Sequence, residues 1–205
     1  MLFDKITIIG IGLIGSSLAR VIMKKGLAGK LCACDKNKEY LAEARELGIV
    51  DEISEDLGKA VENADLVVYA TPVGAYGEIT RQIVPHLKKG VILTDVGSIK
   101  KYSIRKIEEN LPENADVVVV PGHPVAGTEK SGPANGFDTL FEGRWYIVTP
   151  SSRSTEEAVA KVSELWAAAR MKVDKMTPEH HDKVMAAVSH LPHLIAYSIV
   201  GTVSD

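Results

Sequence analysis

A glycine-rich turn near the N-terminus constrains this chain more than any other feature of its sequence. Gly10-Ile11-Gly12-Leu13-Ile14-Gly15 follows an apolar run at residues 5–10 and opens an amphipathic helical segment. In a strand–turn–helix unit the first glycine makes a tight turn, the second lets a phosphate approach the backbone, and the third allows close helix–strand packing. The free N–H groups at the helix start favour an anion. The turn therefore predicts a dinucleotide-binding unit in which Gly10, Ile11, Gly12, Leu13, Ile14 and Gly15 hold the pyrophosphate.

An acidic residue indicates which dinucleotide is bound. Asp35 ends the next predicted strand, at residues 30–35. A carboxylate at that place accepts hydrogen bonds from the adenosine ribose and repels a 2′-phosphate, which predicts NAD as the cofactor. Lys36 and Lys38 follow at once, so NADP stays open as an alternative.

Apolar, β-branched runs alternate with amphipathic helical stretches along most of the chain. This alternation predicts an α/β fold with a doubly wound, mostly parallel sheet of the Rossmann type, spanning residues 1–172. The predicted strands are residues 5–10, 30–35, 65–70, 91–95, 116–120, 145–149 and 172–174, and the predicted helices are residues 13–25, 38–47, 76–87, 100–110 and 155–168.

The pattern changes after residue 172. Thr177-Pro178-Glu179 is typical of a helix start, and the helical pattern then continues to residue 203. Past Ser189 this helix is apolar around most of its circumference, so something must cover it. The residues before it could cover only one side of this helix, so the uncovered side favours an oligomer.

Composition excludes several classes of protein. The chain of 205 residues is 45% hydrophobic and 25% charged, with a net charge of -3, which is typical of a globular protein and unlike a nucleic-acid binder. No apolar stretch is long enough for a membrane span, and Asp4 occupies the place of a signal peptide's basic segment. Cys32 and Cys34 are expected to be reduced thiols of a cytoplasmic protein. A metal or redox role is disfavoured because no further cysteine completes a site.

Polar residues follow the predicted strands where ligands bind in open α/β sheets. Thr71, Pro72 and Val73 come after the strand at residues 65–70 and are expected to line the nicotinamide side of the cleft. The alternative for them is a simple turn before the next helix. Ser98 follows the strand at residues 91–95 and could orient a substrate hydroxyl.

The loop after the strand at residues 116–120 is the predicted catalytic segment. It reads Pro121-Gly122-His123-Pro124-Val125-Ala126-Gly127-Thr128-Glu129-Lys130-Ser131-Gly132. His123 could act as a base toward a hydroxyl whose carbon gives up a hydride, because the pKa of histidine lies near neutrality. A purely structural histidine is the alternative.

These motifs together resemble the prephenate dehydrogenase family, which includes arogenate and cyclohexadienyl dehydrogenases of tyrosine biosynthesis. The resemblance rests most on His-Pro-x-Ala-Gly-Thr-Glu-Lys-Ser-Gly at residues 123–132 and on Ser-His-Leu-Pro-His at residues 189–193. It implies the NAD-dependent oxidative decarboxylation of prephenate or arogenate, with hydride transfer to the nicotinamide and loss of CO2. It also implies that residues 173–205 are the first helix of an all-α dimerisation domain, and hence a homodimer formed through the C-terminal helical region.

The resemblance also implies roles for single residues. His123 matches the catalytic histidine, Ser98 its supporting serine, Glu129 an acidic residue that shapes the pocket, and His193 a histidine at the substrate end of the cleft. The expected substrate-binding set is Ser98, His123, Thr128, Glu129, Lys130, His190 and His193. His190 and His193 are one helical turn apart, so a metal pair is conceivable, but hydride transfer needs none and no metal is predicted. His180 and His181 are expected at the surface.

The chain departs from the family at its C-terminal end. Family members continue into further helices that supply an arginine for a substrate carboxylate, whereas this sequence stops at Asp205. Lys130, Lys100 and Arg144 are the local candidates for that role. Two alternatives therefore stay open: another small NAD(P)-dependent dehydrogenase of the β-hydroxyacid type, and a non-catalytic dinucleotide-binding fragment.

Overall fold

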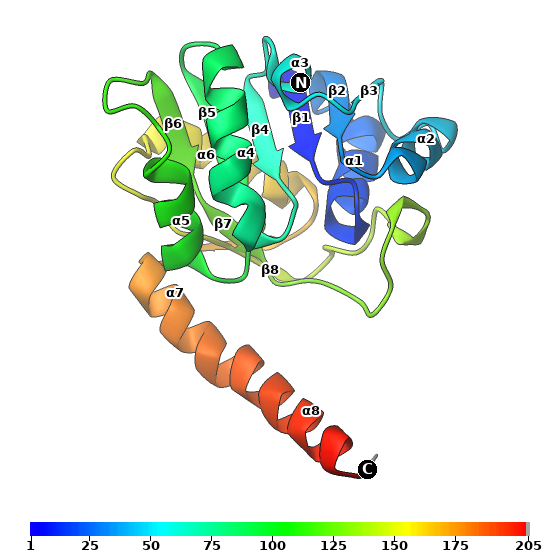
Figure 1. Cartoon of the computed structure of the whole chain (residues 1–205), viewed down its shortest axis with the longest axis vertical. Helices are drawn as coiled ribbons and strands as arrows, with labels where there is room; N and C mark the ends of the chain where they lie inside the picture. Colours follow the sequence, from blue (N-terminus) through cyan, green and yellow to red (C-terminus); the bar gives the residue numbers. More distant parts are fainter. Residues whose placement is uncertain (204–205) are drawn as a thin grey trace.

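A six-stranded parallel sheet forms the centre of the molecule (Figure 1). The structure is a computed structural model that describes residues 1–203, with only the backbone described at residues 190, 193, 199 and 201–203. The strand order β3-β2-β1-β4-β5-β6 places β1 and β4 side by side at the point where the chain reverses direction across the sheet. The strands are β1 (Phe3–Ile9), β2 (Ala28–Cys34), β3 (Glu52–Ser54), β4 (Leu66–Tyr69), β5 (Val91–Asp95) and β6 (Val117–Val120).

Helices cover both faces of this sheet, so the predicted doubly wound α/β fold is confirmed. Apolar side chains of α1 (Leu13–Lys25), α2 (Lys38–Glu46) and α6 (Glu156–Ala168) pack on one face. Those of α3 (Leu57–Val61), α4 (Tyr76–Ile83) and α5 (Lys100–Glu108) pack on the other. Burial on both faces explains why the strands read as continuous Val/Ile runs rather than as alternating patterns.

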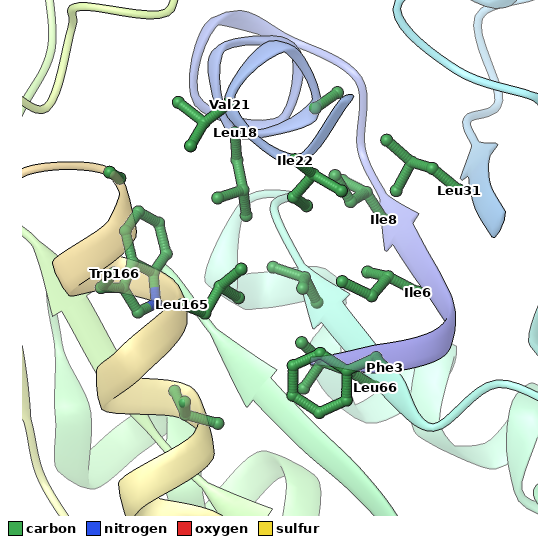
Figure 2. Close-up of a cluster of buried hydrophobic side chains, with 14 of the residues drawn as sticks. Phe3, Ile6, Ile8, Leu18, Val21, Ile22, Leu31, Leu66, Leu165 and Trp166 are labelled. Carbon is green, nitrogen blue, oxygen red and sulfur yellow. The ribbon is translucent and has the colours of Figure 1, made fainter. Parts of the chain in front are cut away.

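The larger core lies between the sheet and helices α1 and α6 (Figure 2). Leu165 and Trp166 of α6 lie beside Leu18 of α1 over the strands. The Trp166 ring stacks on Tyr146 with 4.6 Å between ring centroids. This packing joins the C-terminal third of the domain to its first βαβ unit.

A second, three-stranded sheet was not distinguished by the sequence pattern. β8 (Trp145–Val148) pairs antiparallel with β7 (Gly122–Pro124) and parallel with β9 (Lys172–Lys175). The pattern predicted β8 and β9 but not β7, and it also missed β3 and α3. These missed elements are three to five residues long, too short to show a period.

A helical rod leaves the domain after β9 (Figure 1). It comprises α7 (Pro178–Met185), a π-helical turn (Ala186–His190) and α8 (Leu191–Val203). Thr177 caps its start, as predicted, because its side chain accepts a hydrogen bond from the His180 N–H. The apolar side chains of Val188, Leu191, Leu194, Ile195, Tyr197 and Val200 are all exposed. In the described part of the chain, no helix combines the length and apolar character that a membrane crossing requires.

Candidate active site

The glycine turn between β1 and α1 has three glycines in three different environments. Gly10 has φ +97°, and a Cβ there would lie 2.5 Å from the carbonyl oxygen of Ala70. A Cβ on Gly15 would lie 2.0 Å from the carbonyl oxygen of Gly10. A Cβ on Gly12, by contrast, would have no atom within 4 Å. The first and third glycines thus allow close packing, and the second leaves open space at the start of α1.

The start of α1 is suited to an anion. Gly12 is the N-cap residue, and no side chain caps the first turn. The N–H groups of that turn and the positive end of the helix dipole therefore face the open space. Asp35, just after β2, accepts hydrogen bonds from the Ile11 N–H at 2.8 Å and the Asn37 N–H at 2.9 Å. Asp35 therefore fixes the shape of the turn, and it is half-buried.

The residues after β4 lie at the same edge of the sheet. Thr71 is half-buried, and its Oγ1 is buried without a hydrogen-bond partner in the described structure. Pro72 is exposed, and Val73 begins a short 3-10 turn (Val73–Ala75). A buried hydroxyl without a partner is costly unless a ligand satisfies it. The orphaned Thr71 hydroxyl, the open space at Gly12 and the Asp35 carboxylate all fit a bound dinucleotide.

His123 lies in β7, an edge strand of the three-stranded sheet. It pairs with Ile147 of β8 and is half-buried. Its Nδ1 lies 3.0 Å from Nε2 of His181, and the two rings meet edge to face with 5.2 Å between centroids. Two histidines from segments far apart in the sequence are therefore in direct contact.

The position of His181 corrects the expectation that it lies at the surface. Its side chain is fully buried, whereas that of His180 is exposed. The capped start of α7 turns His181 and Met185, four residues apart, toward the domain, where α7 packs on α5. The i, i+4 spacing of His181 and Met185 on one face of the helix was the sequence signal that could have predicted this burial.

Asp182 completes a chain of three side chains. Its Oδ1 lies 2.8 Å from Nδ1 of His181, and its carboxylate accepts hydrogen bonds from the N–H groups of Lys100 at 2.7 Å and Lys101 at 3.0 Å. Burial acts to raise the pKa of Asp182, but these backbone N–H groups and His181 outweigh it and lower the pKa. Burial lowers the pKa of His181, which keeps that imidazole neutral.

These protonation states determine which nitrogen carries each proton. Neutral His181 donates its Nδ1–H to ionised Asp182, so its Nε2 accepts a hydrogen bond. His123 must then donate its own Nδ1–H to His181. In the neutral form of His123 the proton-free nitrogen is consequently Nε2, the nitrogen that can act as a base.

Lys100 is not available to bind a substrate carboxylate, which corrects the expectation that it is a candidate for that role. Its side chain is fully buried, and Nζ donates to both oxygens of Asp95 at 2.7 and 2.6 Å and to the Gly122 carbonyl at 2.6 Å. Asp95 also accepts hydrogen bonds from the N–H groups of Gly97 and Gly122. The buried pair therefore joins the end of β5, the segment before Ser98 and the residue before His123.

The remaining predicted substrate residues are exposed. Ser98 lies in the loop between β5 and α5, beside Gly97, and Thr128, Glu129 and Lys130 lie in the long loop after β7. Arg144 is exposed just before β8. The side chains of His190 and His193 lie outside the described residues. Among the residues that are described, no group of His, Cys, Asp or Glu is arranged to hold a metal ion.

The fold and the nucleotide edge define the class of the protein, an NAD-binding dehydrogenase domain of the Rossmann type. Residues 18–175 match the family model "Prephenate dehydrogenase, nucleotide-binding domain", and residues 177–205 match "Prephenate dehydrogenase, dimerization domain". The chain therefore belongs to the prephenate dehydrogenase family, and the resemblance noted in its sequence is confirmed.

Individual relatives agree with this assignment. The chain is 41% identical over 202 residues to a cyclohexadienyl dehydrogenase of Zymomonas mobilis, covering 98% of the chain and 68% of that protein. It is 33% identical over 198 residues to a prephenate dehydrogenase of Bacillus subtilis, covering 96% of the chain and 53% of that protein. The crystal structure of prephenate dehydrogenase from Aquifex aeolicus with hydroxyphenyl propionate and NAD+ superposes with a TM-score of 0.88 at 34% identity, covering 97% of this chain and 68% of that one. The chain thus spans about half to two thirds of these relatives.

Proposed function

We propose that this chain supplies the cofactor and proton-transfer residues for the NAD-dependent oxidative decarboxylation of prephenate or arogenate, a step of tyrosine biosynthesis. The observation that carries the proposal is the His123–His181–Asp182 chain at the edge of a dinucleotide-binding sheet. The relatives that carry the names prephenate and cyclohexadienyl dehydrogenase support the substrate class. Bound NAD supplies the hydride acceptor.

The nucleotide-binding residues position the cofactor. Residues Gly10 to Gly15 and the start of α1 bind the pyrophosphate, and Asp35 binds the adenosine ribose. Thr71, Pro72 and Val73 line the nicotinamide side, where the Thr71 hydroxyl finds its partner. Asp35 favours NAD over NADP because a 2′-phosphate would meet its carboxylate.

His123 accepts the proton of the substrate hydroxyl at Nε2. As the hydride leaves the carbon that bears this hydroxyl, the hydroxyl proton moves to His123, and loss of the ring carboxylate as CO2 leaves an aromatic phenolate. The phenolate then takes the proton back from His123, which gives the phenol and restores the neutral base. The positive charge that develops on His123 is shared through its Nδ1–H with His181, which the Asp182 carboxylate polarises. Ser98 orients the same hydroxyl from the neighbouring strand end.

The other substrate contacts come from the loop after β7 and from the helical rod. We assign Thr128, Glu129 and Lys130 of the loop, and His190 and His193 of the rod, to the substrate side of the cleft. Lys130 and Arg144 are the exposed cations left as candidates for a substrate carboxylate.

The exposed apolar face of α8 supports assembly as a homodimer through the helical region. The two free, buried cysteines support a cytoplasmic location.

The experiment follows NADH formation by its absorbance when the protein is given NAD with prephenate, arogenate or a 3-hydroxy acid. We expect NADH with at least one of the two ring substrates. NADH from the 3-hydroxy acid alone would instead support a β-hydroxyacid dehydrogenase. His123→Asn should keep its affinity for NAD and lose turnover by about 10²–10⁴-fold, the usual worth of a general base. His180→Asn is the matched control, since His180 is exposed on α7; equal turnover in both variants would remove His123 from its role.

A further inference from the structure

The long loop after β7 is held at both of its ends. It leaves the active site at Pro124, the last residue of β7, and reaches a 3-10 turn (Pro133–Asn135) beside α1 and α2 (Figure 1). Between these ends, residues 127–131 are exposed, and this segment includes Thr128, Glu129 and Lys130. The segment is short enough that its course depends on both attachments.

Two side chains of α1 form hydrogen bonds to backbone atoms at the far end of this loop. Arg20 donates a hydrogen bond from Nη2 to the Pro133 carbonyl at 3.3 Å. Ser17 Oγ accepts a hydrogen bond from the Phe137 N–H at 3.1 Å and donates to the Leu13 carbonyl at 2.7 Å. Neither residue belongs to the glycine turn, yet both lie on the helix whose start faces the predicted pyrophosphate.

The shape of the contact leaves little room for movement. A Cβ on Gly136 would lie 2.2 Å from Ser16 Oγ and 3.1 Å from the backbone nitrogen of Ser17. Gly132 has φ +89°, and a Cβ there would lie 3.4 Å from the Tyr40 ring of α2. Within the turn, Asn135 Nδ2 donates to the Ser131 carbonyl at 2.7 Å. The turn is therefore a preformed unit that sits directly on the helices of the cofactor site.

We propose that Arg20 and Ser17 are positioning residues: they hold the turn Pro133–Asn135 on α1 and thereby set the course of residues 127–131 at the substrate side of the cleft. The role of residues 127–131 in substrate binding rests on the proposed function, whereas the attachment of the turn to α1 does not. Without the attachment, the segment keeps only its β7 end and samples many conformations, so the free energy of substrate binding must include the cost of ordering it.

Limited proteolysis tests the attachment without any substrate. Trypsin can cut after Lys130, and mass spectrometry can follow cleavage of the Lys130–Ser131 bond. Arg20→Ala removes the hydrogen bond to Pro133, and we expect cleavage to be about fivefold faster, as befits the loss of one such bond. Gly136→Ala removes no polar group but pushes the turn off α1, so it should accelerate the same cut. Lys25→Ala, an exposed residue at the end of α1, is the matched control.

The result that would overturn the proposal is cleavage at the control rate in both Arg20→Ala and Gly136→Ala. Accelerated cleavage after lysines of the parallel sheet as well as after Lys130 would mean general unfolding, and it would equally count against a local attachment. Thermal unfolding followed by circular dichroism distinguishes local release of the loop from general unfolding of the domain.

Steady-state kinetics then test the positioning role. Arg20→Ala should raise KM for the ring substrate while leaving kcat and its pH profile unchanged, because His123 is held by β7 and His181 rather than by the loop. A fall in kcat with unchanged KM would contradict the assignment. If no ring substrate is turned over by the unmodified protein, the proposed function fails, whereas the proteolysis result still decides whether Arg20 attaches the loop.

Discussion

The buried ion pair between Lys100 and Asp95 allows a quantitative test of how the active-site segments are held together. Lys100→Met replaces the ammonium group by an apolar end of similar length. The Asp95 carboxylate would keep its hydrogen bonds from the N–H groups of Gly97 and Gly122 but lose both bonds from Nζ. The Gly122 carbonyl would lose its bond as well.

The magnitude follows from complete burial of both partners, whose side chains have 0% exposure. Removing one partner of a buried pair leaves an uncompensated charge and costs about 3–5 kcal/mol. A domain of this kind has a free energy of unfolding of about 5–15 kcal/mol. The variant should therefore be folded but much less stable, and the loops that carry Ser98 and His123 should loosen with it.

Urea unfolding followed by the fluorescence of buried Trp166 measures this loss. Lys101→Met is the control, because the neighbouring Lys101 side chain is 60% exposed and lies 3.6 Å from Glu179 in a surface pair. We expect the control to change stability by no more than about 0.5 kcal/mol. If Lys100→Met alone does not fold, the double variant with Asp95→Asn should recover folding, since it removes the uncompensated charge.

A loss of unfolding free energy below about 1 kcal/mol in Lys100→Met would refute the reasoning, because the buried pair would then contribute no more than a surface ion pair does. A double variant no more stable than Lys100→Met would refute it too. In that case the buried carboxylate would not be the source of the cost.

Three further predictions concern His181, Gly15 and Gly12. Because burial lowers the pKa of His181 below 6.5, the unfolded chain binds more protons there, so stability should fall as the pH falls below 6.5; His181→Gln should flatten urea midpoints measured between about pH 7 and pH 5. An unchanged slope would show that His181 does not carry the pH dependence. Gly15→Ala should lose about 1–3 kcal/mol of stability because its Cβ would meet the Gly10 carbonyl. Gly12→Ala should fold normally in a thermal melt yet bind NAD at least about tenfold more weakly by calorimetric titration, a loss of ~1.4 kcal/mol; unweakened binding would remove Gly12 from the pyrophosphate site.

Local features of the sequence were sufficient to predict the architecture and to place the candidate cofactor residues at one edge of the sheet. The glycine turn, the Asp35 carboxylate and the helix start at Thr177 act within a few residues of where they stand, and α1 and α7 begin where these signals put them. The continuous apolar strands likewise predicted a sheet covered on both faces. Such signals are readable because they depend on backbone geometry and side-chain periodicity over one element.

Tertiary structure alone decided the partners of His123 and of Lys100. His181 looked like a surface histidine because its neighbours in sequence are polar, but α7 docks on α5 and buries it against His123, 58 residues away in the chain. Lys100 looked like a free cation until the sheet placed it between Asp95 and Gly122. The strand β7 and the attachment of its loop to Arg20 were likewise visible only in the tertiary structure. A sequence pattern reports the face that a residue presents on its own element, whereas these contacts depend on which distant element is packed against that face.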